Sequence, residues 1–303
     1  MTTDLTTERP ADRYPSRTST EPAIVARHDP VVRGHAEQGP LSQDQLDQFD
    51  NDGFVLLDGA LAPDEVELLL DELHRLGGQP ELRDDDRTIL EPGDDVVRSI
   101  FEVHRISDVV ARLAADRRLA GAARQVLGSD VYIHQSRINY KPGFRGKEFY
   151  WHSDFETWHV EDGMPAMRAL SASISLTDND EQNGPLLIIP GSHRSYVTCV
   201  GETPEGHYKS SLRRQEYGVP DDASLAELVE EGGIASMVGG AGSIVLFDAN
   251  CMHGSNGNIT PHPRSNVFLV YNSVENQLVE PFGAPQPRPT FIASRDFTPV
   301  PPL

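Results

Sequence analysis

The sequence predicts an α+β protein in which helices come first and a β-sandwich or barrel forms the core. Two observations lead to this prediction. Up to residue 128, apolar residues recur at the spacing of amphipathic helices. After residue 130 they fall into short alternating runs that Gly and Pro separate. Helices followed by many short strands are typical of chains whose strands close into a sandwich or barrel.

Three helices are predicted in the first part of the chain. The first follows Ser42, whose hydroxyl can cap a helix, and it ends at Gly53. The second runs from Pro63 to Gly77, since proline is favoured in the first turn of a helix and glycine at its end. The third covers residues 106–127, where the same apolar stripe recurs.

Short strands are predicted wherever apolar residues alternate or cluster: residues 54–57, 131–135, 170–176, 186–189, 244–247 and 267–271. Residues 201–235 form an acidic, partly helical insertion between these strands, and such insertions are usually lids or decorations. Residues 1–40 lack hydrophobic periodicity and are predicted to be a flexible N-terminal arm. Residues 41–303 are therefore expected to form a single domain.

Charge composition narrows the class of partner. The chain holds 47 acidic and 26 basic side chains, a formal net charge of −21, which argues against nucleic acid and anionic membrane surfaces. No apolar run approaches the roughly 20 residues of a membrane-spanning helix. The chain has 2 cysteines, and its first residues lack the apolar core of a secretory signal. A cytoplasmic protein without a disulfide framework is therefore expected.

A candidate metal site lies in the segment from Phe149 to His159. His152 and Asp154 are two positions apart, so on a strand both side chains would leave the same face. An imidazole and a carboxylate on one face supply two sites of the facial triad of non-haem iron(II) oxygenases, and a second histidine completes it. Glu156 shares this face and is an alternative carboxylate ligand, whereas His159 has the opposite parity.

Two residues further along the chain fit this site. His253 follows the apolar run 244–247, and Arg264 precedes the strand 267–271. A guanidinium on a neighbouring strand could bind a dicarboxylic co-substrate through two hydrogen bonds. Three protein ligands leave open positions on an octahedral iron, whereas a zinc site would usually be tetrahedral. Cys251 could be a thiolate ligand, but a small buried hydrophobe is the better interpretation.

The pattern resembles the phytanoyl-CoA dioxygenase-like branch of the iron(II)/2-oxoglutarate-dependent dioxygenases. A His-x-Asp pair, a distant His and a following Arg recur in that branch, and residues 49–55 and 190–193 also resemble it. Within the branch, the unbroken stretch 149–165 is similar to the signature of the members that hydroxylate ectoine. The likeness runs from about Leu41 to the C-terminus. It implies a double-stranded β-helix (jelly-roll or cupin-like) core with flanking N-terminal helices.

The resemblance also implies a set of site residues. The iron(II) ligands would be His152, Asp154 and His253. The 2-oxoglutarate site would consist of Arg264, Ser255, Lys141, Gln135 and Phe101. The substrate site would consist of Gln135, Trp158, Thr157, Ser173, Phe247, Phe268 and Arg288, the last as part of a closing arm. Aromatic faces suit the delocalised cation of ectoine, although from spacing alone core packing explains Phe247 and Phe268 better.

The implied activity is the hydroxylation of ectoine to 5-hydroxyectoine with iron(II), 2-oxoglutarate and dioxygen, which releases succinate and carbon dioxide. The product would act as a compatible solute under osmotic or heat stress, and the resemblance also implies a homodimer. Two alternatives keep the same metal ligands. One is a related oxygenase that hydroxylates another small amino-acid derivative. The other is a zinc hydrolase, in which Arg264 and Ser255 would have no evident role.

Overall fold

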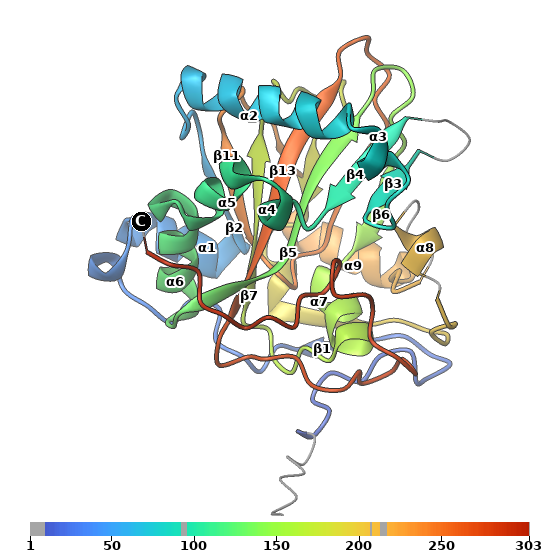
Figure 1. The fold of residues 1–303 in the computed structure, drawn as a ribbon. Helices are drawn as coiled ribbons and strands as arrows, with labels where there is room; N and C mark the ends of the chain where they lie inside the picture. Colours follow the sequence, from blue (N-terminus) through green and yellow to red (C-terminus); the bar gives the residue numbers. More distant parts are fainter. Residues whose placement is uncertain (1–9, 92–95, 207, 213–216, 303) are drawn as a thin grey trace, which may run out of the picture.

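The computed structural model describes residues 10–91, 96–206, 208–212 and 217–302. At its centre lies a seven-stranded antiparallel sheet (Figure 1). Its strands follow the order β2 (Phe54–Leu57), β11 (Ile244–Asp248), β7 (Ala169–Ser175), β13 (Arg264–Ser273), β5 (Val131–Lys141), β4 (Val97–Phe101) and β3 (Thr88–Leu90).

A second antiparallel sheet faces the first. Its strands follow the order β10 (Ala235–Met237), β8 (Leu186–Ile188), β12 (His253–Ser255) and β6 (Phe149–His152). Apolar side chains of both sheets meet in one cluster, in which Phe247 and Phe268 from the large sheet pack with Ile188 from the small one. Strands β1 (Ala23–Ala26) and β9 (Ser195–Thr198) form a separate pair. Two facing antiparallel sheets make the jelly-roll core, which confirms the predicted fold class.

Helices cover the outer face of the large sheet (Figure 1). They are α1 (Gln43–Asp52), α2 (Pro63–Gly77), α3 (Pro80–Arg83), α4 (Val103–Ile106), α5 (Asp108–Ala115), the π-helical η2 (Arg117–Gly121) and α6 (Ala122–Leu127). The remaining helices are η1 (Ala36–Gln38), α7 (Asp154–Thr157), the π-helical η3 (Trp158–Asp162), η4 (Ser192–Arg194), α8 (Tyr208–Ser211) and α9 (Asp222–Gly232). None of the helices in the described part of the chain is long and apolar enough to cross a lipid bilayer.

The alternation of side chains along the central strands separates the helix-facing core from the site. On β13, Val267, Leu269 and Tyr271 pack under the helices. Phe268 belongs to the cluster between the two sheets. Because successive residues of a strand point to opposite faces, Arg264 shares the inner face with Phe268. The inner face of the large sheet therefore carries the polar residues of the site.

The predicted helices are confirmed at their ends but not throughout. Ser42 accepts a hydrogen bond from the backbone N–H of Gln45, and α1 ends at Gly53 in the left-handed region with φ 83°. Helix α2 has the predicted bounds. The helix predicted over residues 106–127 is broken, because Asp116 leaves helical geometry (ψ 139°) and its carboxylate caps the next turn. A capping side chain competes with the helical backbone at that position.

A flexible arm was predicted over residues 1–40; residues 1–9 lie outside the described residues, and residues 10–40 differ from the prediction. Tyr14 and Arg17 are buried, and β1 pairs with β9. The Tyr14 hydroxyl donates to the Asp29 carboxylate over 2.8 Å. This segment has no hydrophobic periodicity because single side chains, rather than one face of a regular element, hold it in place. Residues 201–235 contain α8 and α9, and their role as a lid remains a prediction.

Gly53, at the end of α1, is packed closely against Cys251 and His193, and a substitution there tests this packing. A Cβ built on Gly53 would lie 2.5 Å from Cys251 Sγ and 2.5 Å from His193 Nδ1, whereas one on Gly59 (φ 56°) would meet nothing within 4 Å. We expect Gly53→Ala to lower the free energy of unfolding by about 3 kcal/mol, because a steric clash adds to the left-handed backbone cost. Gly59→Ala should cost about 1 kcal/mol, the backbone term alone. Urea denaturation measures both, and equal losses would contradict the contact.

Candidate metal and co-substrate site

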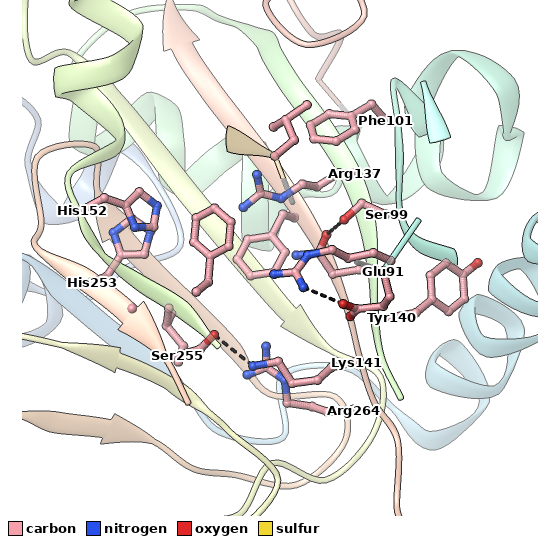
Figure 2. A pocket seen from close by; sticks show the side chains of 17 residues that line it. Glu91, Ser99, Phe101, Arg137, Tyr140, Lys141, His152, His253, Ser255 and Arg264 are labelled. Carbon is pink, nitrogen blue, oxygen red and sulfur yellow. Dashed lines mark hydrogen bonds and ion pairs between the residues drawn. The ribbon is translucent and has the colours of Figure 1, made fainter. Parts of the chain in front are cut away.

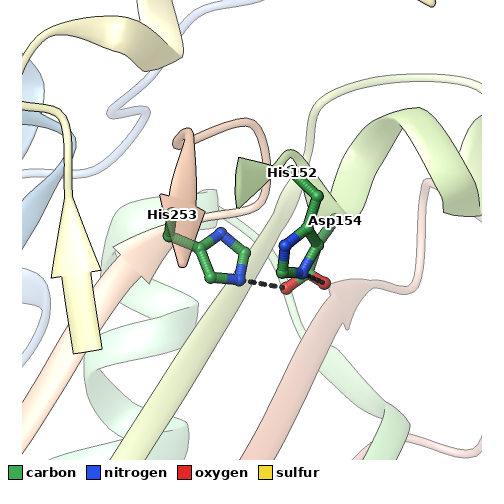
Figure 3. Close-up of side chains that lie close together, drawn as sticks. All are labelled: His152, Asp154 and His253. Atoms are coloured by element: carbon green, nitrogen blue, oxygen red, sulfur yellow. Dashed lines mark ion pairs between the residues drawn. The ribbon is translucent and has the colours of Figure 1, made fainter. Parts of the chain in front are cut away.

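Two histidines are brought together by the pairing of β6 with β12. His253 lies directly opposite His152 in this antiparallel pair. Their ring centroids are 4.2 Å apart, and the two rings converge on the same point (Figure 3). Residues distant in the sequence thus become neighbours through a single strand register.

Asp154 completes the cluster from a helical turn. Strand β6 ends at His152, and Asp154 is the first residue of α7. Its carboxylate oxygens lie 3.7 Å from His152 Nε2 and 3.8 Å from His253 Nε2 (Figure 3). One ligand atom from each residue lies within 4.8 Å of the others. The prediction that these side chains meet holds, but the strand argument for it was wrong, since the chain turns between them.

The backbone fixes the tautomer of both histidines. His152 Nδ1 lies 2.8 Å from the carbonyl of Tyr150, and His253 Nδ1 lies 3.0 Å from the carbonyl of Cys251. A carbonyl only accepts, so each Nδ1 carries the hydrogen and each Nε2 presents a lone pair toward Asp154. Burial, together with the proximity of His253, lowers the pKa of His152 to about 3. The His152 imidazole is therefore neutral, as a metal ligand must be.

Asp154 is an ionised carboxylate. Burial alone would raise its pKa, but His253, His152 and Arg137 outweigh this and lower the pKa overall. Ser171 Oγ lies 3.4 Å from its Oδ2. Two imidazoles and one carboxylate form the donor set of the facial triad, so the residues present fit iron(II).

The alternative ligands point elsewhere. Glu156 accepts hydrogen bonds from Arg17 over 2.7 and 3.0 Å, so it is not at the metal position. The ring nitrogens of His159 contact the Met164 carbonyl and Asp12. Cys251 is buried, with its thiol 3.2 Å from the backbone carbonyl of Gly53. The interpretation of Cys251 as a small buried side chain therefore holds.

A cavity opens beside the two histidines (Figure 2). His152 and His253 lie at one end, and Lys141 and Arg264 lie at the other. Its wall contains seven of the predicted site residues: Phe101, Lys141, His152, His253, Ser255, Arg264 and Phe268. The cavity therefore connects the candidate metal position with the cations predicted to bind a carboxylate.

Arg264 has unused hydrogen-bonding capacity. Its side chain is buried, and its Nε and Nη1 atoms have no hydrogen-bond partner. Burial lowers its pKa to about 10, so it still carries its charge at neutral pH. A buried guanidinium with unpaired donors is costly, and an anion that binds there would offset the cost. Arg264 thus fits the carboxylate of a co-substrate.

Lys141 faces Arg264 across the strand pair. The two residues are register partners of β5 and β13, so two cations stand opposite each other. Lys141 Nζ donates to Ser255 Oγ over 3.0 Å and to the carbonyl of Asn256. Burial, reinforced by the charges of Arg264 and Arg98, lowers the pKa of Lys141 to about 6. An anion between the two cations would favour the charged form of Lys141.

Arg137 is a site residue that the sequence analysis missed. Its guanidinium carbon lies 4.9 Å from the ring centre of Phe268 and 5.9 Å from that of Phe101. Its Nη1 donates to Gln135 Oε1 over 3.1 Å, while its Nε has no partner. The sequence analysis ended this strand at residue 135, whereas β5 continues to Lys141. Arg137 lies on the same face of β5 as Lys141, and this becomes evident only when the strand is extended.

Four other predicted substrate residues, Phe247, Ser173, Thr157 and Trp158, do not belong to the wall of this cavity. The Phe247 ring is 5.1 Å from that of His253, and Ser173 is the register partner of Phe268. Thr157 Oγ1 is buried without a hydrogen-bond partner. Trp158 is buried, with its ring 5.0 Å from that of His134.

Two predicted residues already have protein partners. Gln135 Nε2 donates to the carbonyl of Ile292 over 2.9 Å. Arg288 binds the Asp162 carboxylate through two hydrogen bonds, one of 2.9 Å from Nε and one of 2.5 Å from Nη2. The structure therefore connects the C-terminal tail to both the large sheet and the helical segment after Asp154, but it leaves Arg288 occupied by protein.

Comparison with known proteins identifies the family. The family model for phytanoyl-CoA dioxygenase (PhyH) matches residues 49–266, a stretch that holds the three clustered residues His152, Asp154 and His253 together with Arg264. The chain belongs to the phytanoyl-CoA dioxygenase family. Curated relatives include the ectoine dioxygenase of Bordetella bronchiseptica, 58% identical over 96% of each chain. Another is that of Nocardia farcinica, 57% identical over 95% of each chain.

Two solved structures of one relative are similar to this chain along nearly its whole length. EctD from S. alaskensis with 2-oxoglutarate and 5-hydroxyectoine has a TM-score of 0.86 and 52% identity, covering 94% of this chain and 95% of that one. The same protein with bound Fe has a TM-score of 0.85 and 51% identity, covering 95% and 96%. The overall fold of this chain is therefore that of these relatives.

Removal of one clustered histidine tests the metal site. We expect His253→Ala to weaken iron(II) binding about 100-fold or more, because the site loses an imidazole whose orientation the backbone fixes. His262→Ala, which removes an exposed histidine nearby in the chain, should leave the affinity unchanged. Anaerobic titration with iron(II) against a competing chelator measures both. Equal affinities of the two variants would contradict the assignment of His253.

Proposed function

We propose that this protein hydroxylates ectoine to 5-hydroxyectoine with iron(II), 2-oxoglutarate and dioxygen, releasing succinate and carbon dioxide. The observation that carries this proposal is the full-length similarity to ectoine dioxygenases. The donor set of the site agrees with it, since His152, Asp154 and His253 fit iron(II). Formation of 5-hydroxyectoine places the protein in the synthesis of a compatible solute.

His152, Asp154 and His253 would hold the metal. Iron(II) supplies the redox chemistry that couples decarboxylation of 2-oxoglutarate to insertion of an oxygen atom into a C–H bond. The chain supplies position and shelter from water. Burial of His152 and His253 keeps bulk solvent away from the reacting atoms.

The far end of the cavity binds the distal carboxylate of 2-oxoglutarate. Arg264 provides two unpaired N–H donors, and Lys141 provides an ammonium group that Ser255 orients. The strand register places Lys141 opposite Arg264, and a carboxylate that binds between them favours the charged form of Lys141. Phe101 lines another part of the same cavity, where its ring centre lies 5.9 Å from the guanidinium carbon of Arg137.

Ectoine occupies the space between the metal and the aromatic residues. Its amidinium is suited to the faces of Phe247, Phe268 and Trp158, and Thr157 Oγ1 offers an unused polar atom. Ser173 contributes a hydroxyl opposite Phe268, and Gln135 orients Arg137 by a hydrogen bond. Arg288 would reach the ectoine carboxylate only if its ion pair with Asp162 rearranged, as a closing arm requires.

Two further assignments are proposals of the same kind. A cytoplasmic location fits the two free, buried cysteines, which a reducing compartment preserves. A homodimer is proposed from the family resemblance. A zinc hydrolase with the same ligands is disfavoured, because it gives no role to the unpaired donors of Arg264.

Turnover with a substrate panel tests the activity. We expect succinate and 5-hydroxyectoine to form in equal amounts when the protein is supplied with iron(II), 2-oxoglutarate, oxygen and ectoine. Proline and diaminobutyrate derivatives should raise succinate release far less, because they lack the cyclic amidinium. Chromatography with mass detection measures both products. Succinate release that ignores ectoine but rises with another compound would favour the related-oxygenase alternative.

The pKa of Lys141 makes co-substrate binding depend on pH. In the free protein this pKa is about 6, so at pH 7.5 most Lys141 is neutral. A bound dianion favours the ammonium form and raises the pKa, so binding takes up a proton and weakens as pH rises above about 6. Anaerobic calorimetry in buffers of different ionisation enthalpy measures this uptake. Lys141→Met should abolish it, whereas Lys147→Met, at an exposed position, should not; uptake unchanged in Lys141→Met would refute the assignment.

A further inference from the structure

The helical segment 154–162, which follows strand β6, has two faces. One face carries Asp154, Thr157 and Trp158, the residues assigned to metal and substrate. The other carries Phe155, Glu156, His159 and Glu161, all of them buried. This second face is covered partly by Tyr196 and Phe282 and partly by the N-terminal part of the chain, which lies outside the matched family region.

Residues 12–17, named here the N-terminal buttress, contact the second face at successive points. Asp12 lies 3.0 Å from His159 Nε2. The Tyr14 ring packs edge-on against Phe155 with centroids 5.3 Å apart. Ser16 Oγ donates to Glu156 Oε1 over 2.6 Å. The buttress therefore binds the helical segment through polar and aromatic contacts rather than through a strand pairing.

Arg17 makes the most extensive of these contacts. Its Nε and Nη2 donate to the two oxygens of Glu156 over 3.0 and 2.7 Å, and its Nη1 donates to Glu161 over 2.7 Å. The Arg17 side chain is 1% exposed, and so is that of Glu156. Truncation of one partner of such a pair leaves a buried charge uncompensated. Because Arg17 and Glu156 are buried and joined by two hydrogen bonds, this contact is more rigid than a surface ion pair.

The backbone of Arg17 also indicates a constrained position. Its φ of 57° lies in the left-handed region, which costs a residue with a side chain about 1–2 kcal/mol. Such a conformation persists where surrounding contacts over-determine it. At Arg17 those contacts are the paired carboxylates of Glu156 and Glu161.

Two residues of the 201–235 insertion also contact the ion pair between Arg17 and Glu156. Arg17 Nη1 donates to Thr203 Oγ1 over 3.0 Å. Gly218 has φ 67°, and a Cβ there would lie 2.3 Å from Glu156 Oε2 and 2.6 Å from Arg17 Nη2. Only glycine leaves room for the pair at this point. Arg17 thus joins the N-terminal buttress, the helical segment and the insertion.

We propose that Arg17 is a positioning residue for hydroxylation. Through Glu156 and Glu161 it fixes the part of the helical segment beyond Asp154, and hence the place of Thr157 and Trp158 relative to the metal position. The proposal rests on the proposed function, because its readout is ectoine turnover. The co-substrate residues Lys141, Ser255 and Arg264 belong to strands β5, β12 and β13, which Arg17 does not touch.

This separation predicts a specific defect. When the part of the segment beyond Asp154 shifts, the metal ligands stay together and 2-oxoglutarate still binds to the strands, but ectoine is misplaced relative to the metal. Decarboxylation then continues without hydroxylation of ectoine, provided that an added two-electron reductant such as ascorbate converts the second oxygen atom of dioxygen to water. A shift of about 1 Å at a reacting group is enough to lower the rate of a positioned step by up to about 100-fold.

The test compares Arg17→Gln with Arg13→Gln at saturating iron(II). Arg13 is in the same buttress, but its side chain is 49% exposed in its ion pair with Asp29. We expect Arg17→Gln to lower the ratio of 5-hydroxyectoine to succinate about tenfold and to raise KM for ectoine. KM for 2-oxoglutarate should stay within about twofold of wild type. Arg13→Gln should behave as wild type, and Arg17→Lys should recover part of the ratio.

Gly218→Ala provides a second route to the same ion pair and changes no charge. It should also lower the product ratio, since the added methyl group displaces Glu156 from Arg17. Variants that fold but keep the wild-type ratio and both KM values would overturn the proposal, as would a loss of kcat alone. If Arg17→Gln does not fold, Arg17→Lys and Gly218→Ala decide. Absence of ectoine turnover in the wild type would refute the proposed function instead.

Discussion

The register of β12 against β6 is the constraint on which the site depends. It places His253 opposite His152, and β12 pairs on its other side with β8, where His253 is opposite Ile188. A slip of one residue would turn a histidine to the opposite face of the sheet. The backbone carbonyls that hold the two Nδ1 atoms belong to the same strand region, so register and tautomer are set together.

The cavity is positively charged inside a strongly acidic molecule. Arg98, Arg137, Lys141 and Arg264 line it, and the acidic residue of the wall, Glu91, is paired with Arg98 over 2.9 Å. Clustered buried cations destabilise the free protein, so a dianionic ligand both binds tightly and stabilises the fold. The local field, rather than the net charge of −21, determines which small molecule is attracted.

The sequence predicted correctly those helix ends that are set by capping residues, prolines and glycines next to them in the chain. The Ser42 cap and the Pro63–Gly77 helix follow from side chains adjacent in sequence. The end of strand β5 was missed because its last residues, such as Arg137 and Lys141, are polar on the very face that lines the cavity. The buttress was missed for a different reason. Its residues contact residues about 140 positions away in the chain. The hydrophobic pattern of the sequence reflects regular helices and strands and does not indicate such contacts.

The candidate ligands could be chosen from the sequence, but their geometry could not. Alternation along a strand put Glu156 on the same face as Asp154 and left it open as a ligand. In the structure the chain leaves the strand at His152, and the helical turn sends Glu156 to the opposite side. The acidic residues of the segment 149–165 therefore have two roles. Asp154 faces the metal position, whereas Glu156, Glu161 and Asp162 bind the buried cations Arg17 and Arg288.

This division explains why a short helical segment can carry both a metal ligand and substrate contacts. A helix of one or two turns has little stability of its own. Segment 154–162 is instead held by buried ion pairs to two distant parts of the chain, residues 12–17 and the C-terminal tail with Arg288. Such pairs fix a geometry more than they add net stability. The segment can therefore hold its side chains at fixed positions beside the cavity while the sheets hold the co-substrate independently.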